Sequence, residues 1–85
     1  MGNIIFTEKA WEEYLDWQNQ DKKILKRINL LLKDIFRNGV NGLGKSEPLK
    51  YDKSGFFSRR IDEVNRLVFQ KIGDDINVIQ CKGHY

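Results

Sequence analysis

The sequence has few of the residues on which several classes of small protein depend. It contains a single cysteine, Cys81, so an internal disulfide is impossible and a thiolate metal site is not expected. The run around Cys81 alternates apolar and polar residues, which indicates a small buried side chain. A stretch of about 18 apolar residues, as a membrane helix needs, does not occur, and no secretion signal is recognised. We therefore expect a soluble, cytoplasmic protein with no membrane segment.

Charge is modest in sum but unevenly distributed along the chain. The net charge is +3, yet the residues up to Asp21 include five acidic side chains and only one lysine. Residues 22–37 reverse this balance, with six basic side chains and only one aspartate. A basic segment of this kind suits a polyanion such as nucleic acid, although an ordinary solvated helix face has the same composition.

The hydrophobic pattern predicts one α+β domain over residues 1–85. A strand-like stretch, residues 3–6, precedes a first helix that Thr7 can cap and that reaches about Asn19. Residues at three- and four-residue spacing form the expected apolar stripe of this helix, namely Ala10, Trp11, Tyr14, Leu15 and Gln18.

A second helix and a set of strands complete the predicted elements. Asp21 can cap the second helix, whose strong helical period ends at Asn38-Gly39. Residues 41–48 are glycine-rich, polar and irregular, which indicates a long loop. Three strand-like runs joined by short turns follow it, at residues 56–61, 65–71 and 77–82.

These elements predict a β-α-α-β-β-β fold with a four-stranded, mainly antiparallel sheet. Short turns make the last three strands an antiparallel meander. The helical hairpin must cover one face of the sheet, because its apolar stripe has no other surface to bury against. We expect the opposite face to be uncovered and to bind ligands.

Cleavage of an RNA phosphodiester needs side chains of three kinds. A base takes the proton of the ribose 2′-hydroxyl, a cation stabilises the pentacoordinate phosphorus, and an acid protonates the departing 5′-oxygen. The nucleophile already belongs to the substrate, so orientation suffices and neither a metal nor another cofactor is expected.

The chain contains one candidate of each kind. Glu47 lies in the glycine-rich loop before a proline that restricts its backbone, and a carboxylate can act as the base. Strand alternation places Arg66 opposite Leu67 and Phe69, and therefore on the uncovered face. His84 is the only histidine, and imidazole, with an ordinary pKa of about 6.5, can act as the acid at neutral pH.

Other polar residues could support the phosphate. Lys50 follows Glu47 by three positions, Arg59 and Arg60 lie on a strand next to that of Arg66, and Tyr85 ends the chain. Each has an ordinary interpretation as well, because strand arginines often form surface ion pairs and chain ends are often frayed. Residue type alone therefore favours an ordinary surface and leaves a ribonuclease as the alternative.

Longer strings of residues favour one family. The tryptophan-rich helix at residues 10–18, Gly-Lys-Ser-Glu-Pro-Leu-Lys at 44–50, Ser-Gly-Phe-Phe-Ser-Arg-Arg-Ile at 54–61, Arg-Leu-Val-Phe at 66–69 and the final His-Tyr occur together. In this combination the whole chain resembles the YoeB family, in the RelE superfamily of bacterial type II toxin–antitoxin systems. The chain departs from the family pattern at Asn65, where a histidine is common.

The resemblance implies a RelE-like microbial ribonuclease fold and a specific activity. Similar proteins cut messenger RNA in the ribosomal A site between the 30S and 50S subunits, form a 2′,3′-cyclic phosphate, and so inhibit translation. Transferred by motif, Glu47 resembles the general base, Arg66 the transition-state cation and His84 the general acid. Lys50, Arg59 and Tyr85 would orient or stabilise the phosphate.

The resemblance also implies partners. A YefM-like antitoxin would wrap the toxin and displace its C-terminus, the toxin would form homodimers, and operator DNA would be bound only through the antitoxin complex. Two other functions remain as alternatives. A ParE-like toxin of the same fold would act on DNA gyrase, and a non-catalytic basic module would only bind nucleic acid.

Overall fold

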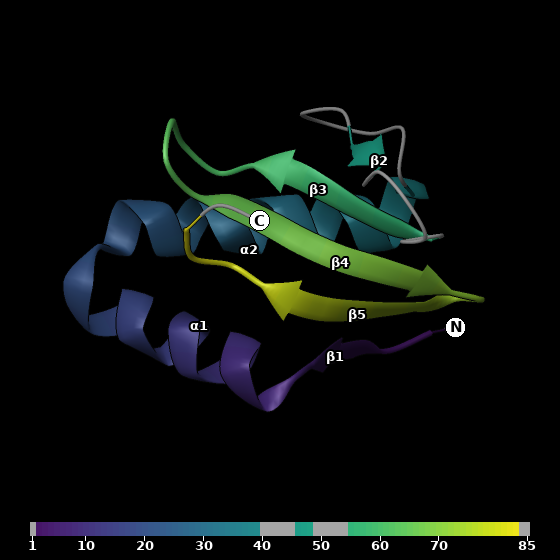
Figure 1. The fold of residues 1–85 in the computed structure, drawn as a ribbon, viewed down its shortest axis with the longest axis horizontal. Helices are drawn as coiled ribbons and strands as arrows, with labels where there is room; N and C mark the ends of the chain where they lie inside the picture. Colours follow the sequence, from purple (N-terminus) through teal and green to yellow (C-terminus); the bar gives the residue numbers. More distant parts are fainter. Residues whose placement is uncertain (1, 40–45, 49–54, 84–85) are drawn as a thin grey trace.

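The computed structural model describes residues 2–39, 46–48 and 55–83, which form two helices and five strands. In chain order these are β1 (Ile4–Phe6), α1 (Glu8–Gln20), α2 (Lys22–Asn38), β2 (Glu47–Pro48), β3 (Phe56–Arg60), β4 (Arg66–Ile72) and β5 (Asp75–Gln80). Both helices lie on one side of a single sheet, as predicted (Figure 1).

Both helices begin at the predicted caps. The Thr7 side-chain oxygen accepts a hydrogen bond from the Ala10 N–H at 3.1 Å, which satisfies a donor of the first turn of α1. The Asp21 carboxylate accepts from the N–H groups of Lys23 and Ile24 at the start of α2. Gly39 ends α2 with a φ of 77°, a value that glycine adopts without a steric penalty.

The sheet contains five strands, in the order β1-β5-β4-β3-β2. The meander β3-β4-β5 is antiparallel, as predicted, and β1 pairs with β5 in parallel. The prediction of four strands was wrong by one, because Glu47 and Pro48 form an edge strand, β2, paired with β3. Two residues are too few for a strand period, and a proline fits only at an edge, so the pattern resembled that of a loop.

The core fills the space between α2, α1 and one face of the sheet. Along α2, the spacing of Ile28, Leu31, Leu32 and Ile35 gives one continuous buried stripe. Leu67 and Phe69 of β4 are 0% exposed and belong to this core, which confirms that they face the helices.

Two expectations about packing were wrong. In α1 the inward tryptophan is Trp17, which is 6% exposed, whereas Trp11 is 45% exposed and Leu15 37%. The sheet face away from the helices is also not bare throughout, since Ser58 and Val68 on it are each 3% exposed.

Candidate functional site

The strand register places Glu47 and Arg66 on the same face of the sheet. Glu47 is opposite Ser58, Ser58 is opposite Val68, and residues directly opposite each other project to one side. Arg66 lies two residues from Val68 along β4 and therefore shares its side. This is the face away from Leu67 and the helices, as the alternation in the sequence predicted.

The same register gives the separation of these two residues. Adjacent strands are about 4.8 Å apart and successive residues about 3.4 Å, so two strands and two residues put their Cα atoms about 12 Å apart. Glutamate and arginine both have long side chains, and both could therefore reach a single phosphate between them. Glu47 is exposed and Arg66 is half-buried.

Arg60 is the arginine that shares this face. It is the direct cross-strand partner of Arg66, and its side chain is exposed. Two guanidinium groups directly opposite each other repel, and a phosphate that accepts hydrogen bonds from both would relieve that repulsion. The signal for this arrangement was present in the sequence, because apolar Phe57 and Ile61 have the parity of Arg59 and send Arg60 to the other side.

Arg59, which we predicted to contact substrate, instead lies on the helix side of β3. Its cross-strand partner is Leu67, and it is only 1% exposed. Its guanidinium forms an ion pair with Asp34 of α2, with Nη1 and Oδ2 2.6 Å apart. This buried position does not fit a phosphate ligand, and the alternation of β3 is the reason.

The turn before β4 orients the side chain of Arg66. Its Nη1 donates hydrogen bonds to the carbonyl oxygens of Asp62, at 2.7 Å, and Asn65, at 3.1 Å. The fork formed by Nε and Nη2 takes part in neither bond, and this fork is the part of arginine that matches a phosphate.

The Asp62 carboxylate organises this turn. It accepts hydrogen bonds from the backbone N–H groups of Asn65, at 2.6 Å, and Val64, at 2.9 Å, and from the Asn65 side chain. The bond from the backbone of Asn65 is the main cause that lowers the pKa of Asp62 below its ordinary value. The turn therefore contains a carboxylate that is stabilised in its charged form.

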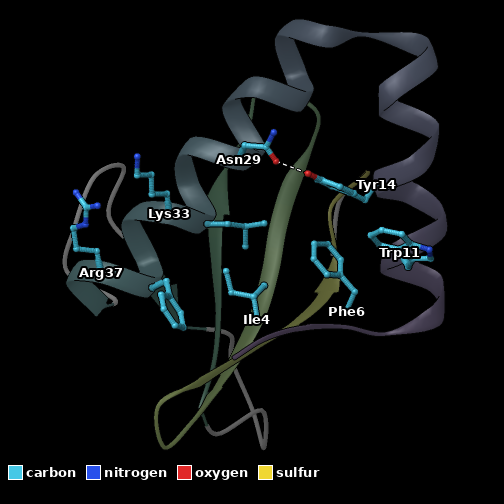
Figure 2. A pocket seen from close by; sticks show the side chains of 9 residues that line it. Ile4, Phe6, Trp11, Tyr14, Asn29, Lys33 and Arg37 are labelled. Atoms are coloured by element: carbon cyan, nitrogen blue, oxygen red, sulfur yellow. Dashed lines mark hydrogen bonds between the residues drawn. The ribbon is translucent and has the colours of Figure 1, made fainter. Parts of the chain in front are cut away.

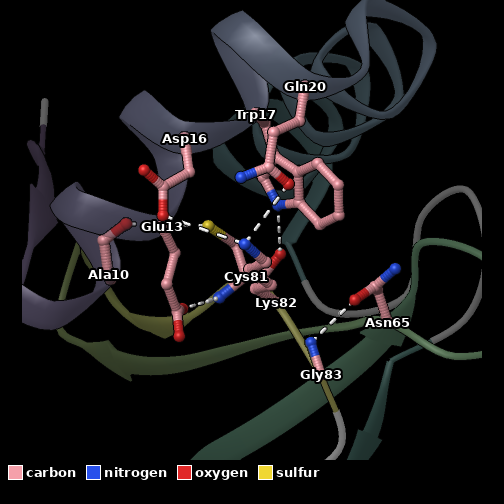
Figure 3. Close-up of polar contacts among 9 residues, drawn as sticks. All are labelled: Ala10, Glu13, Asp16, Trp17, Gln20, Asn65, Cys81, Lys82 and Gly83. Atoms are coloured by element: carbon pink, nitrogen blue, oxygen red, sulfur yellow. Dashed lines mark hydrogen bonds and ion pairs between the residues drawn. The ribbon is translucent and has the colours of Figure 1, made fainter.

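The C-terminal segment is tied to the residues next to Arg66. The Gly83 N–H donates to Asn65 Oδ1 at 2.7 Å, and the Gly83 carbonyl accepts from the Arg66 N–H at 3.0 Å. Gln80 Nε2 donates to the same carbonyl at 3.1 Å. Figure 3 shows Asn65 and Gly83 facing each other across this contact. Asn65 therefore holds Gly83 in place.

Helix α1 holds the same segment from its other side (Figure 3). Trp17 Nε1 donates to the Cys81 carbonyl at 2.9 Å, and the Cys81 N–H donates to the Glu13 carboxylate at 2.9 Å. The Lys82 ammonium lies 5.2 Å from the centre of the Trp17 ring. Burial raises the pKa of the Cys81 thiol to about 12, so this thiol is a packing group, as predicted, and not a nucleophile.

Three of the predicted site residues, Lys50, His84 and Tyr85, lie outside the described residues. The structure therefore places Glu47 and Arg66 on one face of the sheet, and the other three stay predictions. Among the side chains that it describes, no group of three His, Cys, Asp or Glu residues gathers in a way that could hold a metal ion.

A hollow lies on the helix side, between α1, α2 and β1 (Figure 2). It is a groove of about 620 Å³ that includes none of Glu47, Arg59 and Arg66. The rings of Phe6, Trp11 and Tyr14 pack against one another in its wall, and Lys33 and Arg37 lie at its α2 side.

The surfaces of the helices agree with the charge pattern of the sequence. Three lysines of the basic segment, Lys22, Lys23 and Lys26, are exposed at the start of α2. Of the helices described, neither combines the length and the apolar character that crossing a membrane requires.

Comparisons with known proteins agree on one family. Residues 6–85 match the model of the YoeB-like toxin of bacterial type II toxin–antitoxin systems. Toxin YoeB of Synechocystis is 51% identical over 82 residues, which are 96% of this chain and 95% of that protein.

Two solved structures extend this agreement to the fold. The YoeB–YefM complex from Staphylococcus aureus contains a chain with a TM-score of 0.89 and 44% identity, covering 100% of this chain and 99% of its own. The YoeB dimer from the same organism contains a chain with a TM-score of 0.90 and 46% identity, covering 98% of this chain and 97% of its own.

Proposed function

The chain belongs to the YoeB-like toxins of bacterial type II toxin–antitoxin systems, and on this premise we propose that it is an endoribonuclease. It cleaves translated messenger RNA in the ribosomal A site, in the cytoplasm, and so inhibits translation. The ribosome positions the RNA, and the toxin supplies the acid, the base and the cations.

In the proposed reaction Glu47 takes the proton of the ribose 2′-hydroxyl. The 2′-oxygen then forms a bond to phosphorus, and the bond between phosphorus and the 5′-oxygen breaks. His84 gives its proton to the departing 5′-oxygen, which leaves a 2′,3′-cyclic phosphate on one fragment and a 5′-hydroxyl on the other. No electron acceptor or water molecule is consumed in this step.

Cationic side chains stabilise the charge that develops on phosphorus. Arg66 is the proposed principal cation, because its Nη1 is held by the Asp62–Asn65 turn and its orientation is thereby fixed. Arg60, its cross-strand partner, takes the second position on the phosphate in place of Arg59. Lys50 and Tyr85 complete the proposed set.

The main support for this proposal is a backbone hydrogen bond: the Arg66 N–H donates to the Gly83 carbonyl. Gly83 directly precedes His84 in the chain, so the proposed acid is attached to a residue that is fixed beside the proposed cation. Asn65 makes the second contact to Gly83, and Glu47 projects from the same sheet face as Arg66.

We also propose partners of the same family type. A toxin with an uncontrolled nuclease would arrest its own host, and the related YoeB from Staphylococcus aureus occurs in a complex with YefM. An antitoxin similar to YefM is therefore the proposed inhibitor, with operator DNA bound only through that complex. A homodimer is proposed by analogy with the related dimer.

The test separates cleavage from binding. Purified parent, Glu47→Gln and His84→Gln proteins are added to ribosomes programmed with a translated message, and cut sites are mapped by primer extension. Loss of the acid should lower cleavage about 10²- to 10⁴-fold. Ribosome association by His84→Gln should be almost unchanged, because a single side chain contributes little to binding a polyanion.

The alternatives give different results in this assay. A gyrase poison would leave the message intact and would inhibit DNA supercoiling in a parallel reaction. A non-catalytic module would bind programmed ribosomes without cutting in any variant. Parent-level cleavage by His84→Gln would contradict the assigned acid.

A further inference from the structure

Arg59 is a buried charge that the proposed chemistry does not use. Its side chain is 0% exposed, and among the described residues its guanidinium reaches partners in different parts of the chain. Nη1 donates to Asp34 Oδ2 at 2.6 Å, Nε donates to Ser46 Oγ at 2.8 Å, and Nη2 donates to the Gly39 carbonyl at 2.9 Å.

These contacts join the end of α2 to the strand that carries Glu47. Asp34 belongs to the last part of α2, and Gly39 is its C-cap. Ser46 is the residue immediately before Glu47. A single guanidinium on β3 therefore fixes the start of β2 relative to the helix and the sheet.

β2 needs such a support because its pairing with the sheet is short. In the residues described, it spans Glu47–Pro48 and lies at the edge of the sheet. Proline has no N–H to donate to the neighbouring strand. Within the part of the chain that the structure describes, the Arg59–Ser46 bond adds a side-chain contact to the pairing of this segment with β3.

The chemistry of arginine suits this task. A buried charge needs a partner of opposite sign, and Asp34 supplies it. The planar guanidinium then presents its remaining N–H groups in a fixed direction, which a flexible lysine would not do. Asp34 fixes the position of the guanidinium, and the guanidinium in turn fixes the position of Ser46.

We propose that Arg59, fixed by Asp34, is a positioning residue that holds the proposed base Glu47 in place through Ser46. This inference rests on the proposed function, since it requires Glu47 to take the proton. Displacement of a reacting group by about 1 Å can lower a rate about 100-fold, so a small shift of β2 is sufficient to matter.

The sharpest test removes the link and leaves the ion pair. Ser46→Ala deletes the hydroxyl that accepts from Nε, while Asp34 and Gly39 keep their contacts with Arg59. The kcat for cleavage on programmed ribosomes should fall about 10-fold. This loss is smaller than the roughly 100-fold loss that a displacement of about 1 Å can cause. KM should change less than about twofold, because binding and orientation of the RNA rest on other residues.

A matched control separates positioning from general stability. Thr7→Ala removes a hydroxyl at the N-cap of α1, remote from β2, that accepts from the Ala10 N–H at 3.1 Å and donates to the Ile79 carbonyl at 3.4 Å. It should lower the unfolding midpoint at least as much as Ser46→Ala and leave kcat at the parent value.

The decisive measurement repeats Ser46→Ala in a Glu47→Gln background. If Arg59 and Ser46 act through Glu47, the second substitution should change the residual rate less than twofold. A 10-fold loss in both backgrounds, or no loss in the parent background, would overturn the positioning role. Unchanged cleavage by Glu47→Gln alone would instead contradict the proposed function, so the two failures are distinguishable.

Discussion

Replacement of Asn65 by alanine should release the C-terminal segment. Asn65 is 8% exposed, and its side chain accepts from the Gly83 N–H at 2.7 Å and donates to both Asp62 carboxylate oxygens at 3.1 Å. The Gly83 N–H loses its acceptor in Asn65→Ala, which costs about 1–2 kcal/mol for a partly buried group. Asp62 keeps its two backbone donors, so its share of the loss is smaller.

Together these terms predict a loss of about 2 kcal/mol in the free energy of unfolding. For a domain of this size such a loss corresponds to a fall of about 8–16 °C in Tm. Urea denaturation followed by tryptophan fluorescence measures the first quantity, and hydrogen exchange at the Gly83 amide measures the local opening. Asn19→Ala, in an exposed position of α1, is the matched control and should change stability by less than about 0.5 kcal/mol.

Asn65→Asp adds a pH test with a defined sign. It keeps an acceptor for Gly83 but removes the donor to Asp62 and brings a second carboxylate against the first. Mutual repulsion raises the folded-state pKa of one member of that pair above its unfolded value. Stability relative to the parent should therefore be best below about pH 4 and should be lost as the pH rises through the raised pKa.

Two results would refute this reasoning. Parent-like protection of the Gly83 amide in Asn65→Ala would show that the hydrogen bond does not hold the tail. A pH-independent deficit in Asn65→Asp would show that Asp62 and residue 65 do not interact in solution as they do in the structure.

Three further predictions concern separate parts of the molecule. The Cys81 thiol, whose pKa is raised to about 12 by burial, should resist a disulfide reagent at pH 7.5 in the native protein and react within minutes in urea; fast native reaction would contradict its burial. The pKa of Asp62 is lowered from its ordinary value of 3.8. Its contribution to the stability of the folded protein is therefore complete above that pH and is lost as the pH falls through the lowered pKa. Asp62→Asn should accordingly lower Tm at pH 7, and its difference from the parent should shrink below pH 3.8. Reversal of charge at Lys22, Lys23 and Lys26 should weaken ribosome association and flatten its dependence on salt, and an unchanged salt slope would show that this helix faces another surface.

The helices could be predicted from the sequence because their signals are local. Thr7 and Asp21 are polar residues directly before helical periods, and each satisfies N–H groups two or three residues away. The α2 stripe repeats over many turns, so its buried face was unambiguous. The short α1 gave a weaker period, and its predicted stripe included Trp11, which is 45% exposed, and left out Trp17, which is 6% exposed.

The candidate site could be predicted only as a set of residue types. Glu47 and Arg66 were named from chemistry and resemblance, and Leu67 and Phe69 correctly indicated which way Arg66 points. Arg59 was named in error, because a shift of one position along a strand moves a side chain to the other face. Phe57 and Ile61 contained the information that would have corrected it.

The sequence by itself determined the helix ends, the antiparallel meander, and the chemical groups available for catalysis, since each depends on residues a few positions apart. The tertiary structure alone decided that Arg59 is buried against Asp34, that Glu47 and Pro48 form an edge strand, and that Asn65 holds Gly83. Those contacts join residues 9 to 25 positions apart, and they arise from the packing of the helices on the sheet and the register of its strands. A period of two or 3.6 residues carries no information about such partners.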